Sequence, residues 1–253
     1  MTSAPVAVTG AASGLGRALT AKLRADGTAV VTVDLHSVEI GADLSSPGGR
    51  AAAVAGVLER TSSLAGIVPC AGLGPQHPSE RIIAVNFFGA VAFVEGLEGV
   101  VDAGGAVVLI CSNSTTLTPG ADGDLAKACL DGDEATALAI AADTNPAVAY
   151  AASKVAIGKW LRSRVQDLGS RGVRINAVAP GPFLTPLLQE GLDDPATSDL
   201  IKALPIPLGR MGEPDDIADV VAWLLSDGAR YVHGSTVFAD GGIDALLSPN
   251  RFP

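Results

Sequence analysis

Short apolar, β-branched runs alternate with longer helical patterns along the chain, and this alternation limits the possible folds more than any other feature. Strands without polar alternation are covered on both faces, as in parallel sheets. The rhythm therefore predicts an α/β fold of the Rossmann type, a doubly wound, mostly parallel sheet with helices on both faces, in a single domain over residues 1–253. The expected strands are 6–9, 29–34, 67–68, 107–111, 173–179 and 236–239, and the expected helices are 14–26, 49–60, 82–101, 148–168 and 214–226.

Two segments interrupt this rhythm. Residues 115–146 are too many for a simple connection, and 125–142 within them have helical composition. Residues 182–212 hold several prolines and many leucines. Because long excursions from a compact α/β domain usually form lids, pockets or interfaces, we expect an inserted segment at 115–146 and a substrate-side lid at 182–212.

Composition and charge narrow the function. Of the 253 residues, 48% are hydrophobic and 17% charged, and the formal net charge of −10 disfavours nucleic-acid binding. No uninterrupted apolar run approaches the roughly 20 residues that span a bilayer. No basic segment before an apolar stretch opens the chain, so no signal peptide is expected. The short apolar runs predict no membrane contact. Three scattered cysteines predict a reducing cytoplasm, and three histidines without ligand spacing predict no metal site.

A glycine-rich turn joins the first expected strand to the first helix. Gly10, Gly14 and Gly16 leave room for a tight turn, for close helix packing, and for a pyrophosphate that approaches backbone N–H groups at the helix N-terminus. The turn, with Ser13 and Leu15, is therefore expected to bind a dinucleotide. The alternative is a flexible turn that binds nothing.

Asp34 ends the second expected strand, roughly 20 residues after Gly16. A carboxylate there can bond both ribose hydroxyls and would repel a 2′-phosphate, and Leu35 after it supplies no cation, so NAD is the expected cofactor. Asp43 and Leu44 are placed to contact the edge of an adenine. Asp43 is nearly as consistent with a role at the start of the next helix.

Tyr150 and Lys154 share one face of an expected helix, because they are four residues apart. Such a pair alone is usually a surface feature, but beside a dinucleotide turn it becomes a candidate proton-transfer site. A neighbouring ammonium and a positive nicotinamide ring both favour the phenolate, so the pKa of Tyr150 is expected to fall. Ser112 and Ser114 both follow a strand at the ligand-binding edge of the sheet, and Ser112 is favoured because it directly ends the apolar run.

The ordered motifs resemble the short-chain dehydrogenase/reductase family over the whole chain. They are the glycine turn, Asn86, Ser112, Tyr150 with Lys154, and Pro180-Gly181 followed by Thr185. Within the family the chain looks most similar to a bacterial branch of hydroxysteroid dehydrogenases and carbonyl reductases. The resemblance implies a seven-stranded sheet and an NAD-dependent oxidoreductase.

The resemblance also implies roles for single residues. Tyr150 would be the acid/base, Lys154 would hold the nicotinamide ribose, and Ser112 would bond the substrate oxygen. Asn86 would kink its helix and anchor a water of a proton relay. The cofactor would further contact the residues that follow the later strands, namely Ala71, Gly72, Pro180, Gly181 and Thr185.

Two departures from the family pattern carry expectations. Pro69-Cys70 replace the Asn-Asn that is common in the family. This removes a polar contact, but Ala71 and Gly72 can still lie against the cofactor. The inserted segment separates Ser112 from Tyr150 and precedes the helix through which many relatives form tetramers. We therefore expect a homo-oligomer that is a dimer rather than a tetramer.

The lid composition favours an uncharged, apolar alcohol or ketone as the substrate. A 3α-hydroxysteroid or 3-ketosteroid fits, and so does an aryl or allylic alcohol such as coniferyl alcohol. A protein that senses NAD(H) without turnover is a further alternative, whereas a sugar epimerase of the longer relatives is excluded by length. The apolar lid residues expected near the nicotinamide are Phe183, Leu184, Leu187, Leu188, Leu192, Ile201, Leu204, Ile206, Leu208 and Met211.

Overall fold

A computed structural model describes residues 4–195 and 197–250, so the ends of the expected 1–253 domain and Ala196 of the lid lie outside the described residues. Seven strands form one sheet in the order β3-β2-β1-β4-β5-β6-β7, and every neighbouring pair is parallel. The predicted doubly wound α/β fold is thus confirmed. The strands are β1 (Val6–Thr9), β2 (Val30–Asp34), β3 (Ile40–Gly41), β4 (Leu64–Pro69), β5 (Val101–Ile110), β6 (Arg174–Pro180) and β7 (Thr236–Ala239).

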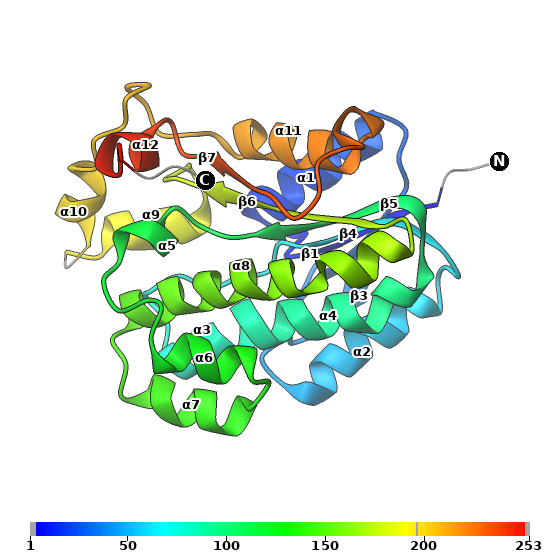
Figure 1. The fold of residues 1–253 in the computed structure, drawn as a ribbon, viewed down its shortest axis with the longest axis horizontal. Helices are drawn as coiled ribbons and strands as arrows, with labels where there is room; N and C mark the ends of the chain where they lie inside the picture. Colours follow the sequence, from blue (N-terminus) through cyan, green and yellow to red (C-terminus); the bar gives the residue numbers. More distant parts are fainter. Residues whose placement is uncertain (1–3, 196, 251–253) are drawn as a thin grey trace.

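Helices cover both faces of the sheet (Figure 1). One face carries α1 (Gly14–Ala25) and α11 (Pro214–Leu225), whose apolar stripes meet the sheet in one buried cluster that includes Leu19 and Val221. A second, larger cluster fills the opposite face. That face carries α2 (Pro47–Leu58), α4 (Ala90–Leu97) and α8 (Pro146–Ser170).

The region expected to be one helix over 82–101 is divided. It contains α3 (Ser79–Ile83), a π-helical turn η1 (Ala84–Gly89), α4 and a 3-10 turn η2 (Glu98–Val100). Strand β5 then begins at Val101, six residues before the expected start, because the chain stays extended through a glycine-rich stretch that looks like a turn in sequence. Strand β3 was missed because it has only two residues.

The stretch Ser79–Val100 is long and apolar enough to cross a membrane by length and composition, although polar residues interrupt its apolar runs. Its most apolar window has a mean hydropathy of 1.5, and 61% of that window is buried. Phe87, Phe93 and Leu97 lie in the larger core cluster. The apolar side chains of this stretch thus pack in the protein core.

The inserted segment forms a third layer outside α8 and α3 (Figure 1). It contains α5 (Ser114–Leu117), α6 (Asp124–Leu130) and α7 (Glu134–Ala142), and α6 packs on α8 while α7 packs on α3. Arg50 of α2 holds Glu134 of α7 through two hydrogen bonds of 2.6 and 2.8 Å. The outer side of the helix that carries Tyr150 is therefore covered by the chain itself.

The expected lid lies at the carboxyl end of the sheet (Figure 1). It contains α9 (Pro186–Asp193) and α10 (Ser198–Lys202), with α12 (Ile243–Leu247) nearby after a 3-10 turn η3 (Asp227–Ala229) and β7. Arg210 pairs with Asp216 of α11 through bonds of 2.6 and 3.0 Å, which ties the end of the lid to the body of the domain.

Candidate active site

A cleft of about 580 Å³ opens at the carboxyl ends of the strands, where ligands of such sheets bind. Its walls are the glycine turn after β1, the ends of β2, β4, β5 and β6, the start of α8, and α9. The structure brings together here every residue predicted for cofactor or catalysis except Asn86. They are Gly10, Ser13, Gly14, Leu15, Gly16, Asp34, Leu35, Asp43, Leu44, Ala71, Gly72, Ser112, Tyr150, Lys154, Pro180, Gly181 and Thr185.

The glycine turn could not form with larger residues. Gly10 and Gly14 have φ angles of +67° and +48°, a left-handed conformation that favours glycine. A Cβ at Gly16 would lie 2.2 Å from the carbonyl oxygen of Gly10, so α1 packs directly on the turn. A Cβ at Gly14 would instead face the Thr185 side chain at 3.3 Å across the cleft. Glycine leaves this space open, and the turn therefore fits the pyrophosphate of a dinucleotide at the N-terminus of α1.

Asp34, the residue predicted to meet a ribose, lines the cleft. Its two carboxylate oxygens accept hydrogen bonds from Ala12 N at 2.9 Å and Leu35 N at 2.6 Å, so the side chain is fixed beside the glycine turn. Asp43 also lines the cleft, and its carboxylate accepts the Ser45 N–H at 2.9 Å. Hydrogen bonds from Ser45 hold the pKa of Asp43 below its usual value. Asp43 therefore shapes the turn before α2, and because it also lines the cleft, its contact with an adenine stays a prediction.

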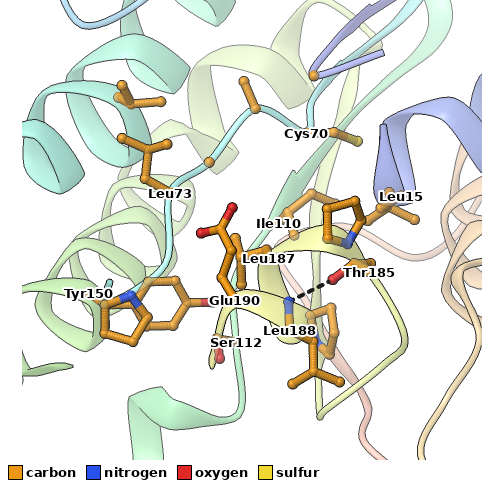
Figure 2. A pocket seen from close by; sticks show the side chains of 18 of the residues that line it. Leu15, Cys70, Leu73, Ile110, Ser112, Tyr150, Thr185, Leu187, Leu188 and Glu190 are labelled. Atoms are coloured by element: carbon orange, nitrogen blue, oxygen red, sulfur yellow. Dashed lines mark hydrogen bonds between the residues drawn. The ribbon is translucent and has the colours of Figure 1, made fainter. Parts of the chain in front are cut away.

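Tyr150 lies half-buried on α8 and turns its ring into the cleft beside Ser112 (Figure 2). Ser112 forms a hydrogen bond with the phenol, and its Oγ accepts the Ser114 N–H at 3.2 Å. The strand does not continue to Ser114, which begins α5 instead. Ser112 is thus the serine that bonds Tyr150, whereas Ser114 also lines the cleft and its role there stays open.

The pKa of Tyr150 departs from its usual value in the direction opposite to the one expected. Burial raises the pKa of Tyr150, and the hydrogen bond from Ser112 opposes this rise without reversing it. Lys154 lies on the same helix face as predicted, with Nζ 5.7 Å from the centre of the tyrosine ring. Burial also lowers the pKa of Lys154, and its ammonium donates a 2.9 Å hydrogen bond to the carbonyl of Ile110.

Asn86 is buried just behind the wall of the cleft, and its expected part in a proton relay stays a prediction. Its Oδ1 accepts the Leu73 N–H at 2.8 Å, and its Nδ2 donates to the Leu73 carbonyl at 3.0 Å. Asn86 lies in the π-helical turn, where the helix is interrupted. The side chain is thus engaged with the loop that continues from Gly72, so Asn86 is a positioning residue for that loop.

Thr185 begins the far wall of the cleft. Its hydroxyl caps α9 by accepting the Leu188 N–H at 3.2 Å, shown as the dashed line in Figure 2. Pro180 and Gly181 end β6 on the adjoining wall. A Cβ at Gly181 would lie 2.7 Å from the Cα of Asp240, so this passage requires glycine.

Half of the apolar lid residues expected near the nicotinamide line the cleft. These are Phe183, Leu187, Leu188, Ile201 and Leu204. The other five do not line it, and Leu208 is 74% exposed. Composition indicates how apolar a segment is, but it does not tell which side of a short helix or turn faces the cleft.

Sequence reasoning missed three polar residues of the substrate side. Gln76 and His77, in the loop between β4 and α3, and Glu190 of α9 all line the cleft. His77 Nε2 lies 3.4 Å from Glu190 Oε2. These residues share no local motif and meet only because α9 folds back over the loop. Within residues 4–195 and 197–250, no group of three or more His, Cys, Asp or Glu side chains is placed to hold a metal ion.

Comparisons with known proteins show which family the chain belongs to. A family model described as enoyl-(acyl carrier protein) reductase matches residues 134–244. The chain is 39% identical, over 98% of its length and 99% of the other protein, to 3-alpha-hydroxysteroid dehydrogenase/carbonyl reductase of Comamonas testosteroni. It is also 33% identical, over 96% of its length, to an uncharacterized short-chain type dehydrogenase/reductase of Sinorhizobium fredii, of which it covers 44%. The chain belongs to the short-chain dehydrogenase/reductase family.

A solved member of this family has nearly the same fold. The crystal structure of the 3-alpha-hydroxysteroid dehydrogenase from Pseudomonas sp. B-0831, complexed with NADH, superposes with a TM-score of 0.94 at 42% identity. The match covers 98% of this chain and 99% of that one. The family and the enzyme class predicted from the sequence, a short-chain dehydrogenase/reductase oxidoreductase, are confirmed.

Proposed function

We propose that this protein is an NAD-dependent oxidoreductase that interconverts an apolar alcohol and its carbonyl, with a 3α-hydroxysteroid and 3-ketosteroid as the substrate pair. The observation that carries the proposal is the hydrogen bond between Tyr150 and Ser112 at the wall of one cleft that also contains the glycine turn. Two relatives with hydroxysteroid dehydrogenase names, matched over nearly the whole chain, support the choice of substrate.

Residues of the chain transfer the proton between the alcohol and its carbonyl form. Tyr150 as phenolate takes the hydroxyl proton of the alcohol, and it returns the proton to the carbonyl oxygen in the reverse direction. Ser112 holds the same substrate oxygen, because it bonds the phenol at the same wall of the cleft. NAD⁺, when bound, accepts the hydride of the carbinol carbon. Lys154 fixes α8 against the end of β5, so that Tyr150 and Ser112 keep their relative positions.

The preference for NAD over NADP rests on charge. The Asp34 carboxylate faces the cleft next to the glycine turn, and it would repel a 2′-phosphate. Leu35, the next residue in the cleft wall, brings no compensating cation. The structure of the Pseudomonas relative in complex with NADH supports the same preference.

The proposed function is tested by NADH formation at alkaline pH from a panel of 3α-hydroxysteroid, benzylic and allylic alcohols. We expect the 3α-hydroxysteroids to give the highest kcat/KM, and NADP⁺ to be a poor replacement for NAD⁺. NADH binding without oxidation of any alcohol would overturn the proposal in favour of a sensor. Highest activity with coniferyl alcohol would overturn the steroid assignment and keep the reaction class.

A dimer in the cytoplasm is the proposed state of the enzyme. The inserted segment covers the outer side of α8, so that surface is not free for a second chain, whereas the edge strand β7 is partly exposed. Cys70, Cys111 and Cys129 are free thiols, which supports a reducing compartment. A solution mass of two chains by light scattering is expected, and a mass of four chains would overturn the dimer.

A further inference from the structure

The substrate side of the cleft contains a polar atom that the fold leaves without a partner. Gln76 lines the cleft, and its Oε1 is fully buried and accepts no hydrogen bond from any part of the chain that the structure describes. A buried polar atom without a partner costs free energy, so such an atom at a binding site indicates a group that the ligand satisfies.

Two glycines make room for this amide. A Cβ at Gly74 would lie 2.7 Å from Gln76 Oε1, and a Cβ at Gly191 would lie 2.9 Å from Gln76 Nε2. The amide therefore sits between its own loop and α9, in a space that side chains at either position would fill. The contact between His77 and Glu190, 3.4 Å apart, joins the same loop to the same helix. Gln76 is thus held at the junction of loop and lid.

Gln76 belongs to the side of the cleft that α9 covers. Leu187 of α9 lies next to Gly74 and Gly191 of α9 lies next to the Gln76 amide, and Figure 2 shows Leu187 and Glu190 on the lid side of the pocket. The reacting oxygen of the substrate is assigned to Tyr150 and Ser112, which hydrogen-bond to each other and not to Gln76. The amide of Gln76 is therefore available to a second polar group.

We infer that Gln76 is a specificity-determining residue that recognises a second oxygen, a hydroxyl or a carbonyl, on an otherwise apolar substrate. This inference rests on the proposed function. The amide accepts a hydrogen bond from a hydroxyl through Oε1, and after a turn about its last bond it donates one to a carbonyl through Nε2. The substrate class is accordingly an apolar alcohol that carries an oxygen substituent away from the reacting carbon.

The test compares two 3α-hydroxysteroids that differ in one oxygen, androsterone with a carbonyl at C17 and 5α-androstan-3α-ol without it. Wild-type enzyme is expected to prefer androsterone in kcat/KM by about 10- to 100-fold, the range for a buried polar group left unpaired. In Gln76→Leu the preference should fall by about 10-fold or more. Gln76→Asn, which keeps the amide but shortens it, should lie between the two.

Gln189→Leu is the matched control, because Gln189 is an exposed residue of α9 that bonds Asp193 and does not line the cleft. It should keep the wild-type preference, and the melting temperature and NADH binding of each variant verify folding. An unchanged preference in Gln76→Leu and Gln76→Asn, or no preference in the wild type, would overturn the inference and leave the proposed function standing. Wild-type enzyme that oxidises no alcohol of the panel would overturn both.

Discussion

Lys154 Nζ donates a 2.9 Å hydrogen bond to the carbonyl oxygen of Ile110, the last residue of β5. The bond joins the helix that carries Tyr150 to the strand that leads to Ser112. Lys154 is buried, and burial lowers its pKa. Its ammonium therefore has a structural partner, and this bond keeps Tyr150 and Ser112 in their relative positions.

Removing Ser112 should move the pH dependence of the enzyme. Alcohol oxidation requires the phenolate, whose fraction grows as the pH rises through the pKa of Tyr150. Because the hydrogen bond from Ser112 lowers that pKa, Ser112→Ala should shift the rising limb of kcat/KM to higher pH and reduce kcat/KM below the limb. Ser114→Ala is the control, since it keeps the backbone N–H that bonds Ser112 Oγ. A limb at the same pH in wild type and Ser112→Ala would contradict this assignment.

Replacing Asp34 should relax the cofactor preference. In Asp34→Ser the carboxylate that opposes a 2′-phosphate is absent, so the ratio of kcat/KM for NADP⁺ to that for NAD⁺ should rise by about 10-fold or more. Most of the change should be in KM, because Asp34 lies beside the glycine turn, where we propose that it meets the ribose of the cofactor rather than the reacting carbon. Steady-state kinetics with both cofactors measure the ratio. A ratio unchanged from wild type would show that Asp34 does not select the cofactor.

The sequence predicts those parts of the site that depend on local spacing. Gly10, Gly14 and Gly16 can be predicted because one turn needs all three. Tyr150 and Lys154 can be predicted because a spacing of four residues brings them to one helix face. The fold class is readable for the same reason, since strand and helix periods are local patterns.

The rest depends on segments that meet only in the folded chain. The bonds between Asn86 and Leu73, and the burial that raises the pKa of Tyr150, involve contacts without a sequence signature. The position of Gln76 depends on the path of α9 over the loop, and the early start of β5 on extended backbone through glycines. Tertiary packing decides each of these features.

Gly16→Ala should destabilise the protein. The new Cβ would lie 2.2 Å from the Gly10 carbonyl oxygen, so α1 must move away from the turn, at a cost of about 1–3 kcal/mol or more in the free energy of unfolding. NADH binding should be lost together with the turn geometry. Gly48→Ala in α2 is the control, because its Cβ would meet nothing within 4 Å. Chemical denaturation and NADH fluorescence measure both effects, and equal behaviour of the two variants would refute the packing argument.

Glu134→Gln should destabilise the attachment of the inserted segment. The Arg50 side chain is 7% exposed, and removal of the Glu134 charge leaves its guanidinium without a carboxylate, at a cost of about 3 kcal/mol. Arg50 also donates to the carbonyl of Leu44 at 2.8 Å, so the wall of the cleft at Leu44 should loosen and NADH should bind more weakly. Asp131→Asn, which breaks an exposed pair with Lys127, should leave stability unchanged. A Glu134→Gln protein as stable as wild type would contradict the expected effect.

The most direct test of the account is kcat/KM for oxidation of a 3α-hydroxysteroid by Tyr150→Phe beside wild type. The phenylalanine keeps the ring and removes the hydroxyl that accepts the proton, so kcat/KM should fall by about 10²- to 10⁴-fold. NADH binding, which verifies an intact cleft, should weaken by no more than about 10-fold, because at most one hydrogen bond is lost. A variant that binds NADH and oxidises the alcohol at the wild-type rate would contradict the assignment of Tyr150 as the proton acceptor.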